Sequence, residues 1–94
     1  MPQHNHKQKN HPKTLDDLSE AVKGYDNLSA LIATNPNTSE KTLEKMSNHF
    51  SRIVRNSVAM NPNTPIKSLE KLREDKEEIV KINAKRNLQK RMSK

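Results

Sequence analysis

The phrase ATNPNTSEKTLEKM at residues 33–46 returns 26 positions later as AMNPNTPIKSLEKL at residues 59–72. The match continues beyond the quoted letters. Residues 53–55, Ile-Val-Arg, reappear as Ile-Val-Lys at residues 79–81, and Asn61 corresponds to Asn87. A sequence period of this size is typical of arrays of stacked units, in which no unit buries its apolar side alone. The repeat therefore predicts a fold built by stacking.

A degenerate first copy precedes these two. The letters TLDDL at residues 14–18 resemble TLEKM at residues 42–46 at an offset of 28, whereas residues 28–35 match residues 54–61 at the usual 26. The two extra residues fall near Gly24-Tyr25-Asp26, where turn-forming residues belong. We therefore expect one domain over residues 13–92, with units at about 13–34, 35–60 and 61–92. The polar residues 1–12 are expected to form a disordered tail.

Each copy is predicted to form two short helices. Thr38 and Thr64 are expected N-caps because a hydroxyl can accept a backbone N–H, and Pro65 suits the first helical position. The Asn-Pro pair should end the second helix, since a residue before proline is disfavoured in the helical region. In the third copy Leu88 replaces the proline, so that helix is expected to run to about Met92. The expected apolar positions are Leu43, Met46, Leu69 and Leu72 in the first helices, and Ile53, Val54 and Val58 in the second.

An antiparallel helical bundle is the alternative, but the short helices and the strict period favour stacking. The phrase A-x-N-P-N-T-P-x-x-x-L-x-x-L, followed by I-V-R-x-x-V-A, resembles the leucine-rich repeat variant family over roughly residues 14–87. That resemblance implies a short right-handed α-solenoid related to HEAT repeats, in which α and 3₁₀ helices alternate. Some members carry an iron–sulfur cluster on cysteines. This chain has no cysteine, so we expect no cofactor.

Composition and charge narrow the function. The sequence contains no apolar run long enough for a membrane span and no signal-like N-terminus, and the absence of cysteine suits a cytoplasmic protein. The net charge is +7, but residues 1–13 carry +3, residues 14–80 carry −2 and residues 81–94 carry +6. The basic excess therefore lies at the two ends, and the C-terminal segment could attract phosphate.

Side chains capable of chemistry are present without a catalytic pattern. His4, His6 and His11 lie in the polar tail, which offers no fixed metal geometry, and His49 is expected to be exposed in a loop. The acidic pairs Asp16-Asp17 and Glu77-Glu78 are expected to stabilise helix N-termini rather than to exchange protons. No nucleophile, glycine-rich or metal motif is present. We therefore expect neither an enzyme nor a metal site.

Two functions remain open. The first is a scaffold or adaptor module that binds an acidic macromolecule, most simply a protein, and that could also self-associate through its open ends. The second is a DNA- or RNA-binding protein that uses the basic C-terminal helix. The candidate contact residues for these two functions are Arg52, Arg55, Lys81, Lys85, Arg86, Lys90 and Arg91.

Overall fold

The computed structural model describes residues 12–93. The predicted disordered tail, apart from Pro12, lies outside these residues. The described chain is all-helical, with six helices, no strands and 66% of its residues in helices, which confirms the predicted all-α class. The helices are α2 (Leu15–Ala21), α3 (Asp26–Thr34), α4 (Glu40–Met46), α5 (Arg52–Met60), α6 (Ile66–Leu72) and α7 (Glu78–Met92).

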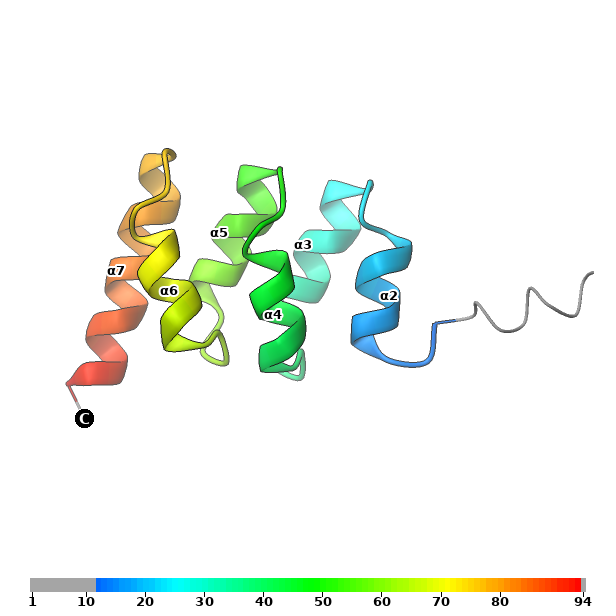
Figure 1. The fold of residues 1–94 in the computed structure, drawn as a ribbon, viewed down its shortest axis with the longest axis horizontal. Coiled ribbons are helices and arrows are strands. Elements are labelled where there is room, and N and C mark those ends of the chain that lie inside the picture. Colours follow the sequence, from blue (N-terminus) through cyan, green and yellow to red (C-terminus); the bar gives the residue numbers. More distant parts are fainter. Residues whose placement is uncertain (1–11, 94) are drawn as a thin grey trace, which may run out of the picture.

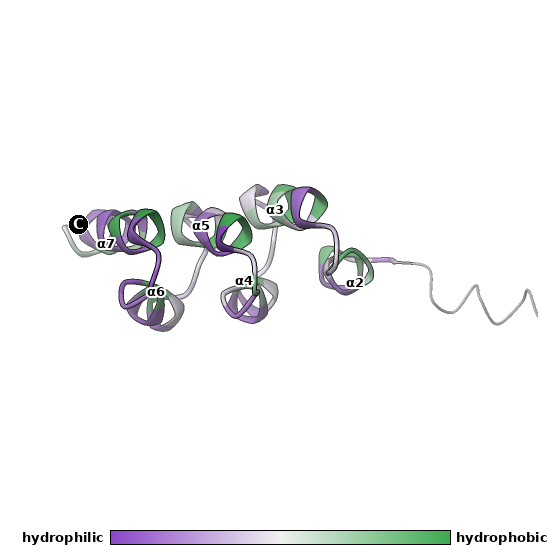
Figure 2. Cartoon of the chain, turned by 90° about the horizontal axis from the view of Figure 1, so that it is seen from above, coloured by the Kyte–Doolittle hydropathy of each residue, from purple (hydrophilic) through white to green (hydrophobic). Residues whose placement is uncertain are grey.

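The helices form two rows, between which the chain alternates (Figure 1). Helices α2, α4 and α6 make the first row, and α3, α5 and α7 make the second, as the view from above shows (Figure 2). The second row is tightly connected, because α5 packs against both α3 and α7. The core lies between the rows, and its fully buried side chains include Leu43, Val54, Val58, Leu69, Leu72 and Val80.

The repeated Asn-Pro-Asn-Thr phrase forms a turn after α3 and again after α5. In the first such turn, the carbonyl of Asn35 accepts the N–H of Thr38 at 3.1 Å, and its side-chain Oδ1 accepts the N–H of Asn37 at 2.8 Å. Proline at the second turn position fixes φ near its required value and supplies no N–H that could continue the helix. Asn61, Asn63 and Thr64 repeat the same two bonds at 3.1 and 2.8 Å. The predicted helix ends at Asn35 and Asn61 are confirmed.

The expected N-cap role of Thr38 and Thr64 is wrong. Their hydroxyls point back to the preceding helix and donate to the carbonyls of Ile32 and Val58, at 2.6 Å in each case. Both hydroxyls are buried, and each is a second donor to its carbonyl, which also accepts the backbone N–H of Asn35 or Asn61 at the end of the helix. The N-caps of α4 and α6 are instead Ser39 and Pro65, so Pro65 precedes the first helical residue.

Asparagine side chains connect successive turns. The amide Nδ2 of Asn61 donates to the carbonyls of Ala33 and Asn35 at 2.7 and 3.0 Å. Asn87 donates in the same way to Ala59 and Asn61, at 2.9 Å each, although it lies inside α7. The partners are therefore 26 and 28 residues apart, at both junctions. Each amide satisfies the buried carbonyl of an alanine, Ala33 or Ala59, which would be costly to leave unpaired, and adds a second donor to an asparagine carbonyl.

Three further expectations needed correction. The short helices are α rather than 3₁₀ within residues 12–93, because i→i−3 bonds appear only at their ends, as in Asn48 to Lys45. Ile53 is 53% exposed, whereas its neighbour Val54 is fully buried. Helix α7 extends to Met92 as predicted, but the side chain of Met92 lies in solvent.

Candidate partner-binding surface

The outer side of the second row is rich in exposed apolar side chains. Large exposed apolar residues on α3, α5 and α7 are Leu28, Leu31, Ile53, Met60, Ile79, Ile82 and Met92. The first row has one comparable residue, Ile66, while Tyr25 and Phe50 lie in the loops before α3 and α5. We call the exposed side of α3, α5 and α7 the second-row face. An apolar surface rimmed by polar residues is typical of an interaction site.

The two rows of helices also differ in net charge. The helices of the first row carry six acidic and four basic residues, a net charge of −2. Those of the second row carry two acidic and seven basic residues, a net charge of +5, and α7 alone contributes five of the basic residues. The side of the molecule that exposes apolar groups is therefore also the positive side.

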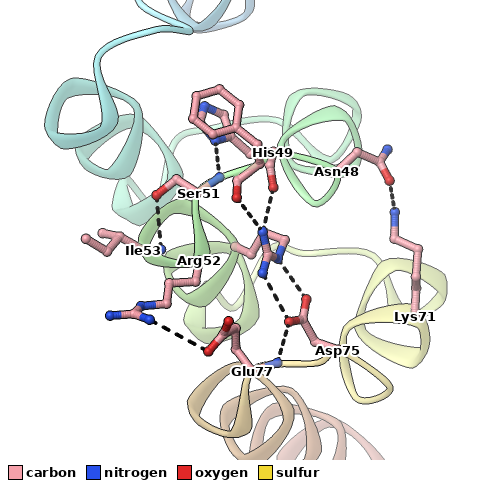
Figure 3. Close-up of polar contacts among 10 residues, drawn as sticks. Asn48, His49, Ser51, Arg52, Ile53, Lys71, Asp75 and Glu77 are labelled. Carbon is pink, nitrogen blue, oxygen red and sulfur yellow. Dashed lines mark hydrogen bonds and ion pairs between the residues drawn. The ribbon is translucent and has the colours of Figure 1, made fainter.

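Arg55 is not part of this exposed face, which corrects the sequence-based assignment. Its side chain is 11% exposed and forms a two-point ion pair with the carboxylate of Asp75, through Nε to Oδ2 at 2.8 Å and Nη2 to Oδ1 at 3.2 Å (Figure 3). Its Nη1 donates to the carbonyls of His49 and Phe50 at 2.9 Å each. Arg55 thus joins α5 to the loops before α5 and α7, and four of its five N–H donors are used within the protein.

The carboxylate of Asp75 is held in its charged form. Burial of its side chain would raise its pKa, but the hydrogen bond from Arg55, the backbone N–H of Glu77, and the positive charges of Arg55 and Lys76 outweigh burial. The pKa of Asp75 is therefore lowered from its ordinary value. Since Glu77 N–H donates to Oδ1 at 2.9 Å, Asp75 also shapes the start of α7.

Two other candidate cations have acidic neighbours. Arg52 is exposed and pairs with Glu77 at 3.8 Å, as drawn in Figure 3. Lys81 is partly buried and pairs with Glu78 at 3.5 Å. Exposed pairs of this length contribute little to stability, so both side chains can exchange partners. Their charges are nevertheless partly balanced within the protein.

Arg91 also has a structural role. Its Nη2 contacts the carbonyls of Pro62 and Thr64, the latter at 2.6 Å, and so holds the last turn of α7 against the preceding Asn-Pro-Asn-Thr turn. By contrast, Lys85, Arg86 and Lys90 are exposed, and none forms an ion pair with another described residue. Of the seven candidates, these three are the cations best placed to meet a partner.

The free cations of α7 do not lie on one line. At about 100° per residue, Arg86 and Lys90 are about 40° apart around the helix, and Lys85 lies about 100° from Arg86. Arg86 and Lys90 line a groove of about 340 Å³ with Met60, Pro62, Asn83 and Asn87, while Lys85 does not. We call this hollow the α5–α7 groove. The cations that form one cluster in the sequence thus point in different directions around α7, and only Arg86 and Lys90 face the groove.

A second hollow lies at the opposite end of the face. Residues Gly24 to Leu28 and Ile53 line this groove of about 680 Å³, which we call the α3–α5 groove. Tyr25, Leu28 and Ile53 supply its exposed apolar side chains, and Asp26 is the one charged residue in its lining. The two grooves therefore differ in charge: Asp26 is the charged residue of the first, and Arg86 and Lys90 are the charged residues of the second.

His49 differs from its predicted state. The ring is half-buried, with Nε2 2.9 Å from the carbonyl of Lys23 and Nδ1 accepting the N–H of Ser51 at 3.0 Å. It also packs against Phe50, with ring centroids 4.5 Å apart, beside a hollow of about 400 Å³ between α2 and the loop after α4. His49 thus connects two loops, much as Arg55 does at the next junction.

The sequence did not identify the apolar half of the surface. A usable signal was present: Ile53-Val54 and Ile79-Val80 are adjacent pairs, and neighbours on a helix point about 100° apart. One member of each pair is therefore a candidate to face away from the core. Sequence reasoning assigned both Ile53 and Val54 to the core, and the structure buries only Val54.

Residues 12–93 contain no group of three metal-ligating side chains. Within the same residues, no helix has both the length and the apolar character needed to cross a bilayer. Asp16, Asp17 and Glu78 lie in first turns of helices, and Glu77 is an N-cap, which confirms the expected position of the acidic pairs. This arrangement stabilises helix N-termini.

Comparisons with protein-family models, with curated proteins and with solved structures found no match. Function must therefore be argued from the geometry of this chain.

Proposed function

We propose that this protein is a non-catalytic interaction module that binds an acidic protein partner through its second-row face. The observation that carries the proposal is the coincidence of apolar exposure and positive charge on one side of the molecule. Within residues 12–93, seven of the ten large exposed apolar side chains belong to α3, α5 and α7, and these helices carry a net charge of +5, or +4 without the buried Arg55. Interfaces combine an apolar centre with charges that complement the partner.

The proposed architecture is a short α-solenoid of about three units with a 26-residue period. It is supported by the alternation of helices between two rows and by side chain to backbone bonds between residues 26 and 28 apart, from Asn61 and from Asn87. On the same grounds we place the chain with the leucine-rich repeat variants, as its Asn-Pro-Asn-Thr phrases suggest. Stacked helical units offer extended binding surfaces, and this chain would use one in the cytoplasm.

Photocrosslinking tests the proposed face. A benzophenone amino acid is placed in cells either at Ile53, on the second-row face, or at Lys67, which is exposed on the first row. We expect one protein, identified by mass spectrometry, to crosslink from position 53, and to be lost when Ile82→Glu is added. Equal crosslinking from both positions, or crosslinks that survive Ile82→Glu, would contradict the proposed face.

Nucleic-acid binding is a second candidate, favoured by the three cations of α7 that have no acidic neighbour. Labelled duplex DNA and single-stranded RNA should be titrated at low and moderate salt against the wild type and a triple variant, Lys85→Gln, Arg86→Gln and Lys90→Gln. This variant is better than truncation, which would remove the buried residues Asn87 and Leu88. If wild-type binding persists at moderate salt and the triple variant loses it, the second function replaces the first.

A further inference from the structure

We infer that the second-row face recognises a peptide segment with two chemically different parts: apolar side chains that occupy the α3–α5 groove, and carboxylates that occupy the α5–α7 groove. This inference rests on the proposed function and specifies the partner's chemistry. The partner segment can then bind in only one orientation across the three helices, because the two grooves differ in charge.

The α3–α5 groove suits the apolar part. Tyr25, Leu28 and Ile53 are exposed there although they are large and apolar, and Leu31 continues the apolar surface along α3. The negative charge of Asp26 would repel a carboxylate of the partner at this end of the face. Arg52, which adjoins Ile53 in sequence, already has Glu77 as a neighbour at 3.8 Å. Covering these side chains would remove apolar surface from water, and Asp26 would have to remain at the solvated edge of the groove.

The α5–α7 groove suits the carboxylates. Met60 and Pro62 contribute apolar surface, while Arg86 and Lys90 contribute two positive charges from one side of α7. Neither cation has an acidic partner among the described residues. In the preceding unit, the position equivalent to Arg86 is held by Met60, so the positive charge is specific to this end of the row. An arginine beside a lysine favours planar oxyanions such as carboxylates.

The geometry sets the spacing between the two parts. Ile53 and Met60 lie seven residues apart on α5, which corresponds to about 10 Å along the helix at ~1.5 Å per residue. The two grooves are also displaced sideways by one spacing between helices, about 9 Å. The diagonal is therefore about 14 Å, which an extended chain crosses in roughly four residues at ~3.3 Å each. We expect the apolar and acidic positions of the segment to be separated by this interval.

Selection from a displayed library of random peptides tests the inference without a known partner. The full chain serves as the target, and its amide resonances report which residues the enriched peptides touch. We expect enrichment of peptides with an apolar pair and an Asp/Glu cluster about four residues apart, shifting resonances of α3, α5 and α7. Against a charge-reversed target, Arg86→Glu with Lys90→Glu, the same peptides should bind at least roughly tenfold more weakly at physiological salt.

The outcomes separate this inference from the proposed function. The inference is overturned if the selected peptides bind the second-row face but are not enriched in Asp or Glu, or if they bind the charge-reversed target equally well. In either case the proposed function of the face still stands. Peptides that shift only α2, α4 and α6, or no enrichment at all, overturn both. Displacement of enriched peptides from Arg86 and Lys90 by duplex DNA or single-stranded RNA at physiological salt assigns the groove to nucleic acid instead.

The control target is Lys41→Glu with Lys67→Glu, which reverses two exposed cations on the first row. It changes the net charge as much as the test variant does, so a general electrostatic effect would weaken binding to both. We expect it to bind the enriched peptides within about twofold of the wild type, because charges beyond a Debye length of about 8 Å are largely screened at physiological salt. Equal weakening in both variants contradicts a specific acidic site.

Discussion

Replacing Arg55 with methionine should destabilise the protein severely, although the sequence alone places this residue among the partner contacts. The substitution keeps much of the apolar stem but removes two hydrogen bonds to Asp75 and two to the carbonyls of His49 and Phe50. It leaves a carboxylate whose side chain is 9% exposed without its counter-ion. Removing one partner of a buried pair costs about 3–5 kcal/mol, and we expect the lower end because this pair borders on solvent.

A loss of about 3 kcal/mol is large for a domain of this size. At ~0.05–0.15 kcal/mol per residue, the described chain has a total stability of about 4–12 kcal/mol. The midpoint of thermal unfolding should fall by roughly 15 °C, as followed by far-ultraviolet circular dichroism. Urea unfolding should give the same loss of free energy from the shift of its midpoint.

Arg52→Met is the matched control. Arg52 lies three positions from Arg55, but its side chain is exposed and its ion pair is long, so the loss should be under about 0.5 kcal/mol. Asp75→Asn combined with Arg55→Met should be less destabilised than the two single changes summed, by about 1 kcal/mol or more. If Arg55→Met were as stable as Arg52→Met, the structural role of Arg55 would be refuted.

The other predictions concern pH, the turns and the exposed cations. Because the pKa of Asp75 is lowered in the folded state, its carboxylate contributes its full stabilisation above about pH 4 and progressively less as the pH falls through the lowered pKa. The midpoint of urea unfolding should therefore decline on acidification less steeply in Asp75→Asn than in the wild type. Asn61→Ala should cost about 1–3 kcal/mol in urea unfolding, because the buried carbonyl of Ala33 loses its donor and that of Asn35 keeps only the N–H of Thr38. Asn63→Ala, at an exposed position, should cost under about 1 kcal/mol. Thr64→Val should cost about 1–2 kcal/mol by thermal unfolding, since it removes a buried hydrogen bond to the carbonyl of Val58, and Thr34→Val, at an exposed site, should cost less. The triple variant Lys85→Gln, Arg86→Gln and Lys90→Gln should unfold within about 0.5 kcal/mol of the wild type, and a larger loss would show that these cations hold the fold.

The sequence predicted the framework because the framework depends on local rules. Pro36 and Pro62 disfavour the helical conformation of the residue before them, and leucines three residues apart share one side of a helix. For the same reason the absence of proline at Leu88 correctly predicted the extension of α7. These features require no knowledge of what packs against them.

The sequence could not predict contacts between units. A threonine before a helix is ordinarily a cap for that helix, and only the path of the chain shows that Thr38 and Thr64 reach backward to the preceding one. Likewise, Arg55 and Asp75 are 20 positions apart, and nothing local to either residue indicates that they pair. In the sequence, the six cations of the last 14 residues appeared equivalent. In the structure, Arg91 binds backbone carbonyls, whereas Arg86 and Lys90 line a groove.

The central claim is that α5 and α7 bury one side and present an apolar, basic face on the other. Methyl NMR with a soluble gadolinium chelate tests it directly, because the chelate broadens the signals of exposed methyl groups only. We predict strong broadening for Ile53, Ile79 and Ile82, and little for Val54 and Val80, which are fully buried. Comparable broadening of Val54 and Ile53, or of Val80 and Ile79, would contradict the claim and remove the face on which the proposed function depends.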